Sequence, residues 1–156
     1  MEETVKEEAK HLANHMARNA SFVVLALAII ISGYLSYLKV ANAEAVCVEA
    51  SVFDCGTVLN SFYSEIRGVP IAWLGLAVNI IAVALLLLEP RVPILQRYGV
   101  ALIFGLILFA FLFSVYLVYV QAALIKSYCP WCLTHEALIT ILFGLCAWRL
   151  SQWELA

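Results

Sequence analysis

Residues 98–132 read YGVALIFGLILFAFLFSVYLVYVQAALIKSYCPWC. The first part, residues 98–125, contains no charged side chain and would reach ~42 Å as a helix at ~1.5 Å per residue. Because a bilayer core is only ~30 Å thick, this stretch predicts a membrane-spanning helix that tilts or projects beyond the core. A short polar turn and the pair Cys129 and Cys132 follow it directly.

The rest of the chain is similarly apolar. Hydrophobic residues make up 65 % of the 156 residues, charged residues make up 13 %, and the mean hydropathy is +0.97. A soluble domain is roughly half apolar and a quarter charged, so the composition predicts an integral membrane protein surrounded by lipid. The apolar runs predict four spans, at residues 21–39, 69–88, 98–125 and 132–150.

We therefore expect an all-α fold: a four-transmembrane-helix bundle with an outer-side loop that carries a short amphipathic helix. Residues 21–150 would form the membrane domain, and residues 1–20 and 151–156 would form tails. In the first tail, Val5, Leu12 and Met16 recur at helical spacing. This pattern predicts either a helix that lies on the membrane surface or a frayed, solvated tail.

The Cys129-Pro130-Trp131-Cys132 element has the features of a thiol–disulfide exchange centre. Proline favours the first position of a helix, which would make Cys129 the N-cap residue and place Cys132 in the first turn. Free backbone N–H groups and the positive end of the helix dipole favour thiolate over thiol there. The less specific alternative is that both cysteines are buried packing residues.

The loop between the first two spans, residues 41–68, contains the other pair, Cys47 and Cys55. Its apolar residues between Thr57 and Ile66 predict an amphipathic helix at the bilayer edge. Asp54 or Thr57 could cap that helix. With Asp54 as the cap, Cys55 would sit at a helix N-terminus, where thiol pKa values are lowered.

Charge predicts the orientation in the membrane. An even number of spans places both termini on one side, together with six of the nine basic residues. Because positive charge is retained in the cytoplasm, we expect a multi-pass cell-membrane protein with both termini cytoplasmic. All four loop cysteines would then face the oxidising outer compartment, where disulfides persist. The basic residues are scattered, and no nucleic-acid partner is expected.

Four motifs in this order resemble one family. They are Cys47-x7-Cys55, the run Asp54-Cys55-Gly56-Thr57-Val58-Leu59-Asn60-Ser61, the run Gly68-Val69-Pro70-Ile71-Ala72, and Cys129-x-x-Cys132. With four spans, they resemble the vitamin K epoxide reductase family, specifically its prokaryotic branch of quinone-linked, disulfide-forming membrane proteins that act like DsbB. The resemblance extends from the first span to Leu150.

The resemblance implies a four-helix bundle around a quinone pocket, with ubiquinone or a menaquinone of the vitamin K type as the cofactor. It implies that Cys132 is the thiolate next to the quinone ring and that Cys129 exchanges with Cys55. Cys47 would take electrons from a thioredoxin-like partner. Ser61 matches a loop serine that lies close to the redox centre in the family.

Two departures from the family pattern matter. Many bacterial members carry a fused thioredoxin-like domain, which this sequence lacks, so we expect a separate partner that resembles DsbA. The animal enzymes carry a tyrosine four residues after the final cysteine of the motif, where this chain has Glu136. That difference argues against reduction of vitamin K epoxide itself.

The residues alone also predict an electron relay. A reduced partner would attack the Cys47–Cys55 disulfide, and the resulting dithiol would attack Cys129–Cys132, each step being a thiolate displacement. The second pair must then pass two electrons to an acceptor that is not a thiol. In a membrane, a lipid-soluble quinone is that acceptor.

A quinol also needs two protons. His135 and Glu136 lie three and four residues after Cys132, on the same helical face. Either could donate a proton, since an ionisable group at membrane depth is a functional candidate. The alternative is an ordinary acidic residue in the first turn of the helix, solvated by the interface and favoured by the helix dipole.

Other residues are weaker candidates. Ser61, on one helix face with Val58, could hydrogen-bond a quinone carbonyl or a thiolate. The apolar residues that could line the quinone pocket are Leu59, Phe62, Tyr63, Ala72 and Leu117. Asn79 is interpreted as a helix–helix hydrogen-bonding residue. Cys146 lies ~21 Å along the helix from Cys132 and is interpreted as a packing residue.

Four other functions compete with thiol oxidation by quinone. One is vitamin K epoxide or quinone reduction proper, and another is a structural zinc site made by the four loop cysteines. A third is a conduit that carries reductant outward, which would need a cysteine pair near the inner face. The last is a non-catalytic membrane scaffold.

Overall fold

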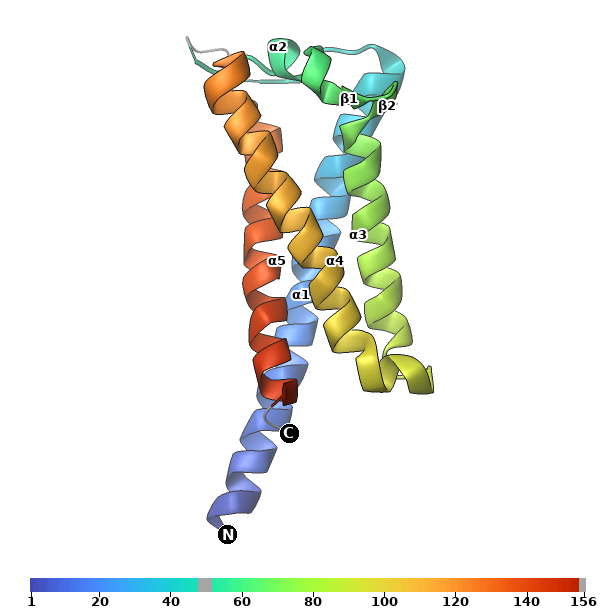
Figure 1. The fold of residues 1–156 in the computed structure, drawn as a ribbon, viewed down its shortest axis with the longest axis vertical. Helices are drawn as coiled ribbons and strands as arrows, with labels where there is room; N and C mark the ends of the chain where they lie inside the picture. The colour runs from blue at the N-terminus through green and yellow to red at the C-terminus, as the bar shows by residue number, and fades with distance from the viewer. Residues whose placement is uncertain (48–51, 155–156) are drawn as a thin grey trace.

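The computed structural model describes residues 1–47 and 52–154, and it is an all-α bundle (Figure 1). Within these ranges, four helical stretches are long and apolar enough to cross a membrane. The elements in chain order are α1 (Glu2–Ala41), α2 (Cys55–Leu59), η1 (Phe62–Ser64), β1 (Glu65–Ile66), β2 (Val69–Pro70), α3 (Ile71–Leu88), α4 (Pro93–Tyr119), η2 (Val120–Ile125) and α5 (Pro130–Glu154).

The first helix is much longer than the span expected at residues 21–39. Helix α1 begins at Glu2 and runs without a break to Ala41, where Asn42 adopts the left-handed conformation (φ 48°) that commonly ends helices. Residues 2–20 therefore continue the first spanning helix, and form neither a frayed tail nor a separate surface helix, the two alternatives expected. Its first turns project beyond the other helices (Figure 1) and are mostly exposed.

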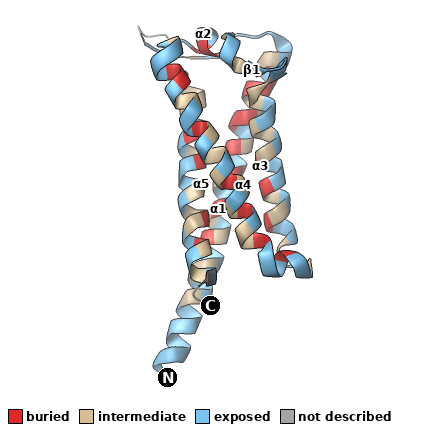
Figure 2. Cartoon of the chain, in the orientation of Figure 1, coloured by how far each residue is buried: buried red, intermediate tan, exposed pale blue. Residues whose placement is uncertain are grey.

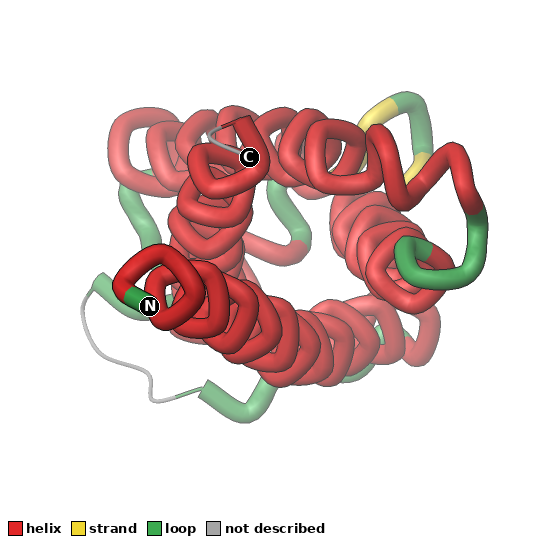
Figure 3. Tube along the Cα trace, turned by 90° about the horizontal axis from the view of Figure 1, so that it is seen from below, coloured by secondary structure: helices red, strands yellow, loops and turns green. Residues whose placement is uncertain are grey.

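The four long helices pack around one core. Helix α1 contacts α3 and α5, while α4 contacts α3 and α5, which closes the ring of helices seen along the bundle axis in Figure 3. The core residues are Leu25, Ala82, Leu86, Ile103, Ile107, Leu142 and Cys146. The environment of Cys146 is therefore that of a packing residue.

The outer surface of the bundle is apolar. Large side chains such as Ile30, Leu102 and Phe109 are more than half exposed, and Figure 2 shows exposed positions along the outside of every long helix. A soluble protein rarely leaves so large a continuous apolar surface uncovered. Lipid chains are the solvent that suits this surface, as expected for a membrane bundle.

Both termini lie at one end of the bundle (Figure 1), which we call the terminal end. Arg149 of α5 is only 2 % exposed there and binds both carboxylate oxygens of Glu89, at 2.7 and 3.0 Å. Its Nε also donates to Asn14 of α1 at 3.1 Å. A buried charge is tolerated when it is paired in this way, and the network joins three segments of the bundle.

The opposite end carries the four loop cysteines, and we call it the cysteine end. Residues 55–70, which we call the cap, cross this end (Figure 1). The amphipathic helix expected between Thr57 and Ile66 was wrong in its limits, because the only α-helix described in the cap is α2, Cys55–Leu59. Asp54 accepts a hydrogen bond from the Thr57 N–H at 2.9 Å and so starts the helix earlier.

A β-hairpin replaces the second half of the expected helix. Ile66 pairs with Val69, which leaves Arg67 and Gly68 as a two-residue turn with φ of 53° and 81°. Positive φ at both central residues suits the right-handed twist of a tight hairpin, and glycine adopts it without a steric cost. The chain thus turns back to enter α3 at Ile71.

The third and fourth long helices also differ from the expected spans of 98–125 and 132–150. Helix α4 begins at Pro93, because proline fits the first helical position. It changes to a π-helix, η2, over Val120–Ile125, and Lys126 ends it in the left-handed conformation (φ 57°). Helix α5 begins at Pro130. Short π segments often occur at functional sites.

Candidate functional site

All four loop cysteines lie at the cysteine end. Cys47 and Cys55 form a disulfide, while Cys129 and Cys132 are free thiols. Cys55, Val58 and Cys129 form one buried cluster, and Cys47 and Cys132 pack against it. The fold therefore brings together two pairs that are far apart in the sequence, as the relay requires.

The start of α5 agrees with the expectation from the motif. Pro130 is its first residue, Cys129 precedes it and Cys132 lies in its first turn. The backbone N–H of Cys132 approaches Cys129 Sγ at 3.5 Å. Cys129 is fully buried (0 % exposed). The element is thus a helix N-terminus that holds one sulfur against free backbone donors.

This environment favours a thiolate at Cys129. The pKa of Cys129 is lowered from 9.0 to about 7, and the largest cause is a hydrogen bond from the Cys132 side chain. Burial opposes the shift, while the backbone N–H groups of Cys132 and Trp131 contribute to it. The resemblance assigned the thiolate to Cys132, whereas this state of the site, with the second pair reduced, favours it at Cys129.

We expect a thiolate signal that is lost as the pH falls through about 7, because the lowered pKa keeps Cys129 ionised above that value. Substitution Cys132→Ala removes the hydrogen-bond donor, so the midpoint should move upward toward 9.0. The ultraviolet absorbance of thiolate, followed during pH titration of protein whose second pair is reduced, measures both. Cys146→Ala is the control and should leave the midpoint unchanged. A wild-type midpoint near 9 would contradict the assignment.

Backbone hydrogen bonds hold the two pairs together. Phe53 and Tyr128 form an isolated parallel bridge. Asp54 N donates to Tyr128 O at 3.1 Å, and Tyr128 N donates to Val52 O at 2.9 Å. These bonds lie just before Cys55 on one segment and just before Cys129 on the other. The two sulfurs that must exchange are therefore fixed by neighbouring backbone.

Side chains fix the ends of the cysteine segments. Trp131 Nε1 donates to Val46 O at 3.0 Å, and its ring packs on Tyr34 with centroids 5.1 Å apart. Gln121, a buried residue of η2, accepts the Cys129 backbone N–H at 3.0 Å. Trp131, between the two cysteines of the second pair, thus holds Val46, the residue before Cys47. Gln121 of η2 holds Cys129.

The helix N-terminus expected at Cys55 is present. Hydrogen bonds from the Thr57 hydroxyl, and then from the Thr57 backbone N–H, hold the pKa of Asp54 below its usual value. Asp54 is thus the cap of α2. In the disulfide-bonded state, Cys55 has no thiol for this N-terminus to influence.

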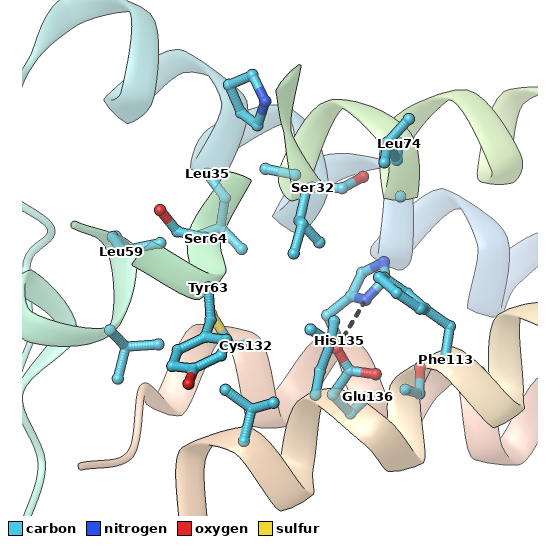
Figure 4. Close-up of a pocket in the computed structure, with 18 of the residues that line it drawn as sticks. Ser32, Leu35, Leu59, Tyr63, Ser64, Leu74, Phe113, Cys132, His135 and Glu136 are labelled. Atoms are coloured by element: carbon cyan, nitrogen blue, oxygen red, sulfur yellow. Dashed lines mark ion pairs between the residues drawn. The ribbon is translucent and has the colours of Figure 1, made fainter. Parts of the chain in front are cut away.

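A cavity of about 410 Å³ lies beneath the cap, between α1, α3, α4 and α5. Apart from Phe62, the residues predicted for the quinone pocket or for proton donation all line it: Leu59, Ser61, Tyr63, Ala72, Leu117, Cys132, His135 and Glu136. Phe62 does not line it and is 90 % exposed. Figure 4 shows Leu59, Tyr63, Cys132, His135 and Glu136 among the residues around the cavity.

Ser61 lines the cavity from a different conformation than expected. It follows α2 in extended backbone (φ −66°, ψ 156°) rather than on a helix face with Val58. Its hydroxyl donates to Val58 O at 2.8 Å. The hydroxyl oxygen can still accept a hydrogen bond from a neighbour in the cavity.

The alternative to a proton role, an acidic residue in the first turn that the interface solvates, does not fit the positions of His135 and Glu136. They lie in the second turn of α5, and Glu136 is only 8 % exposed. His135 Nδ1 lies 4.0 Å from Glu136 Oε1, the pair marked in Figure 4. Asn79 Nδ2 lies 3.0 Å from His135 Nε2 and 3.4 Å from Ser32 Oγ. Asn79 thus joins α3 to α1 and α5, as predicted.

Three other residues that line the cavity, Lys39, Gln121 and Ser32, have no direct signal in the sequence. Lys39 of α1 bonds Leu59 O at 2.9 Å and Glu65 at 3.1 Å. Gln121 and Ser32 are buried polar residues of spanning segments. Polar residues inside apolar runs are the general signal for such positions, but it does not distinguish a ligand site from a helix contact.

The cavity suits a small, mostly apolar molecule that carries polar groups. Its volume is in the range of small-molecule sites, and most of its lining is apolar. Two buried polar atoms of lining residues, Asn79 Oδ1 and Glu136 Oε2, have no hydrogen-bond partner. Because unpaired buried polar atoms are costly, both are positions where a ligand hydroxyl fits as a donor, and a protonated Glu136 carboxyl could also donate to a ligand oxygen.

A zinc site made by the four loop cysteines disagrees with this arrangement. Zinc requires thiolates, whereas Cys47 and Cys55 are bonded to each other. Across residues 1–47 and 52–154, no group of three or more His, Cys, Asp or Glu side chains is placed to hold a metal.

The comparison with known proteins agrees with the architecture. Residues 18–147 match the family model described as the Vitamin K epoxide reductase family, an oxidoreductase family whose members use cysteines and quinone-type partners. The family match thus agrees with the structure, in which two cysteine pairs lie at one end of four apolar helices. The chain belongs to the vitamin K epoxide reductase family and is a multi-pass membrane protein of that oxidoreductase family.

Proposed function

We propose that the protein is a quinone-dependent thiol oxidase that makes disulfides and reoxidises a thioredoxin-like partner. The observation that carries this proposal is the place of the second cysteine pair. Cys129 is packed against Cys55 on one side, and Cys132 lines the apolar cavity on the other. One pair thus joins a thiol exchange site to a site for a lipid-soluble acceptor.

Electrons enter at Cys47. It is the more accessible member of its pair, since Cys55 is only 2 % exposed. A partner thiolate attacks Cys47 and releases Cys55, and a second partner thiol completes the partner's disulfide. Cys55 then attacks Cys129 of the oxidised second pair, and Cys132 leaves as a thiolate. Cys47 next attacks Cys55, which restores the Cys47–Cys55 disulfide and releases Cys129. The second pair now holds two electrons.

In the structure the first pair, Cys47 and Cys55, is oxidised, and the second pair, Cys129 and Cys132, is reduced. That combination is the one in which electrons have reached the second pair. A quinone supplies an acceptor of two electrons and two protons when bound. Leu59, Tyr63, Ala72 and Leu117 would hold it against Cys132, with Ser61 and Glu136 at polar edges.

The partner we propose is a separate protein that resembles DsbA, docking at the cysteine end. The bias in basic residues, six to three, supports cytoplasmic termini. This orientation places the cysteine end outside the cell membrane, in the compartment where disulfides persist. The exposed Val46 and the half-buried Cys47 beside it support access for the partner from that side.

Anaerobic mixing of the purified protein with a quinone and reduced DsbA-like protein tests the function. Wild-type protein should produce one quinol for each dithiol oxidised. The absorbance change from quinone to quinol measures this yield. Cys132→Ser should abolish quinol formation, because the second pair can no longer close. Cys146→Ser is the matched control and should form quinol at the wild-type rate. Oxidised quinone that persists while thiols still exchange would sink the proposal.

Vitamin K epoxide is the alternative acceptor, and the same assay includes it. Glu136 stands in the cavity where the animal enzymes have a tyrosine. We expect quinone to be reduced and vitamin K epoxide to remain unchanged. Reduction of the epoxide at a comparable rate would make the protein an epoxide reductase.

A further inference from the structure

The inner wall of the cavity carries a directed chain of hydrogen bonds. It begins on α1, where Ser32 Oγ donates to Ala28 O at 2.7 Å. Because a hydroxyl has one proton to donate, Ser32 Oγ can only accept from its other neighbour, Asn79. This determines which end of the Asn79 amide faces Ser32: the NH₂ group, at 3.4 Å.

The same NH₂ group determines the state of the imidazole. Asn79 Nδ2 lies 3.0 Å from His135 Nε2. Since the amide nitrogen donates there, Nε2 must accept, and it carries no proton in this arrangement. The ring proton is then on Nδ1, and His135 is neutral. Gly75 of α3 lies beside this ring, and a Cβ at that position would make an ordinary van der Waals contact with His135 Cε1 at 3.7 Å.

Glu136 is left as the group that faces the ligand. Its Oε1 lies 4.0 Å from His135 Nδ1, the side that carries the proton. Its Oε2 is buried and has no hydrogen-bond partner. Lys39, the lysine among the lining residues, is paired with Glu65. The other ionisable groups of the lining are Tyr63, Cys132 and His135.

We propose that Glu136 exchanges a proton with the bound quinone through Oε2, and that Asn79 and His135 hold it in position. This inference rests on the proposed function. It assigns proton donation to Glu136, whereas the sequence alone left both His135 and Glu136 as candidates. Glu136 is a catalytic residue in this scheme. Asn79 and His135 are positioning residues. His135 Nε2 accepts the hydrogen bond from Asn79 and so has no proton to give.

The protons and electrons balance with one proton from water. The Cys129 thiolate and the Cys132 thiol give up two electrons and one proton and become a disulfide, while the quinone takes up two electrons and two protons and becomes a quinol. Glu136 gives its carboxyl proton to the nearer ring oxygen and is reprotonated by the proton that leaves Cys132, four residues earlier on the same face. Water supplies the proton for the other ring oxygen.

Single-turnover mixing of reduced protein with menadione, and separately with ubiquinone-1, tests the role of Glu136. Glu136→Gln keeps the size and shape of the side chain but not the acid, so quinol formation should slow by about 10²-fold or more. Glu136→Asp should restore part of the rate, and His135→Gln should lose far less than Glu136→Gln. Glu44→Gln, which removes an exposed carboxylate at the same end, is the control. Thiol exchange between the two cysteine pairs should be unchanged in all of them.

Two measurements do not depend on turnover. Infrared difference spectra should show a carboxyl band that responds to menadione in wild-type protein and is absent in Glu136→Gln. Nitrogen NMR of the protein without quinone should show His135 protonated on Nδ1 and not on Nε2. His135→Gln identifies that signal among those of the three histidines.

The outcomes separate this inference from the function on which it rests. No quinol from wild-type protein with either quinone would overturn both. Quinol formation by Glu136→Gln at the wild-type rate, a carboxyl band that ignores menadione, or a proton on His135 Nε2 would overturn the assignment of Glu136 and leave the thiol oxidase function intact.

Discussion

The double variant Cys47→Ser/Cys132→Ser is expected to accumulate with a disulfide between Cys55 and Cys129. These substitutions remove the two cysteines that would otherwise resolve the exchange intermediate. The remaining two lie in one buried cluster with Val58. The backbone bridge between Phe53 and Tyr128 holds their segments side by side. A mild oxidant should therefore close this bond in nearly all molecules.

The complementary variant Cys55→Ser/Cys129→Ser is the matched control. It also retains two loop cysteines, Cys47 and Cys132, which pack against the cluster from outside rather than within it. We expect the first variant to close its bond at least about 10-fold faster, because fixed proximity raises the effective concentration of one thiol at the other. Cys146 is present in both and is buried in the main core.

Thiol trapping under denaturing conditions, followed by mass spectrometry of linked peptides, measures the two yields. Fast closure of Cys47 to Cys132 with no Cys55–Cys129 bond would mean that the relay passes through different sulfurs. Equal rates in both variants would mean that the cap does not select one pair. Either result would contradict the order of exchange that the packing predicts.

The long helices could be predicted from the sequence because each is an uninterrupted apolar run, and hydropathy alone determines where such a run can lie. The start of α5 was also predictable, since Pro130 fits the first helical position. The start of α1 could not be predicted from hydropathy, because a hydropathy pattern ends where the apolar run ends. Residues 2–20 have helical spacing but carry charged side chains.

The cap shows where the pattern of apolar residues misleads. The spacing of Val58, Phe62 and Ile66 suits a helix, but Arg67 and Gly68 form a tight hairpin turn that pairs Ile66 with Val69. The turn decides the structure of the residues before it. A positive φ at Arg67 has no signature in a single sequence, because arginine adopts it only in context.

The chemistry of the second pair could be predicted, while the polar wall of the cavity could not. Two cysteines at a helix N-terminus indicate exchange chemistry by themselves. The roles of Asn79 and Gln121 depend on which residues of other helices face them. His135 and Glu136 could be placed on the face of Cys132, but their burial depends on α3 and α4.

Replacement of Lys39 by methionine is expected to release the cap from the bundle. Lys39 Nζ bonds Leu59 O at 2.9 Å, Ser64 Oγ at 3.3 Å and the Glu65 carboxylate at 3.1 Å. It thus ties α1 to the end of α2, to η1 and to β1. Hydrogen bonds to a charged group contribute about 1.5–3 kcal/mol each at partly buried positions. Methionine keeps the apolar stem that lines the cavity and removes all three bonds.

The expected effect is faster opening of the cap, on the order of 10²-fold, since every ~1.4 kcal/mol is a factor of ten in an opening equilibrium. Hydrogen exchange at the Asn60, Ser61 and Ser64 amides, which bond within the cap, measures it. Lys126→Met removes an exposed lysine at the same end and is the control. Because Leu59 and Tyr63 lie over the cavity, the same variant should release quinone faster. Unchanged exchange in Lys39→Met would mean that the cap is held by its apolar contacts and by the bridge at Tyr128 instead.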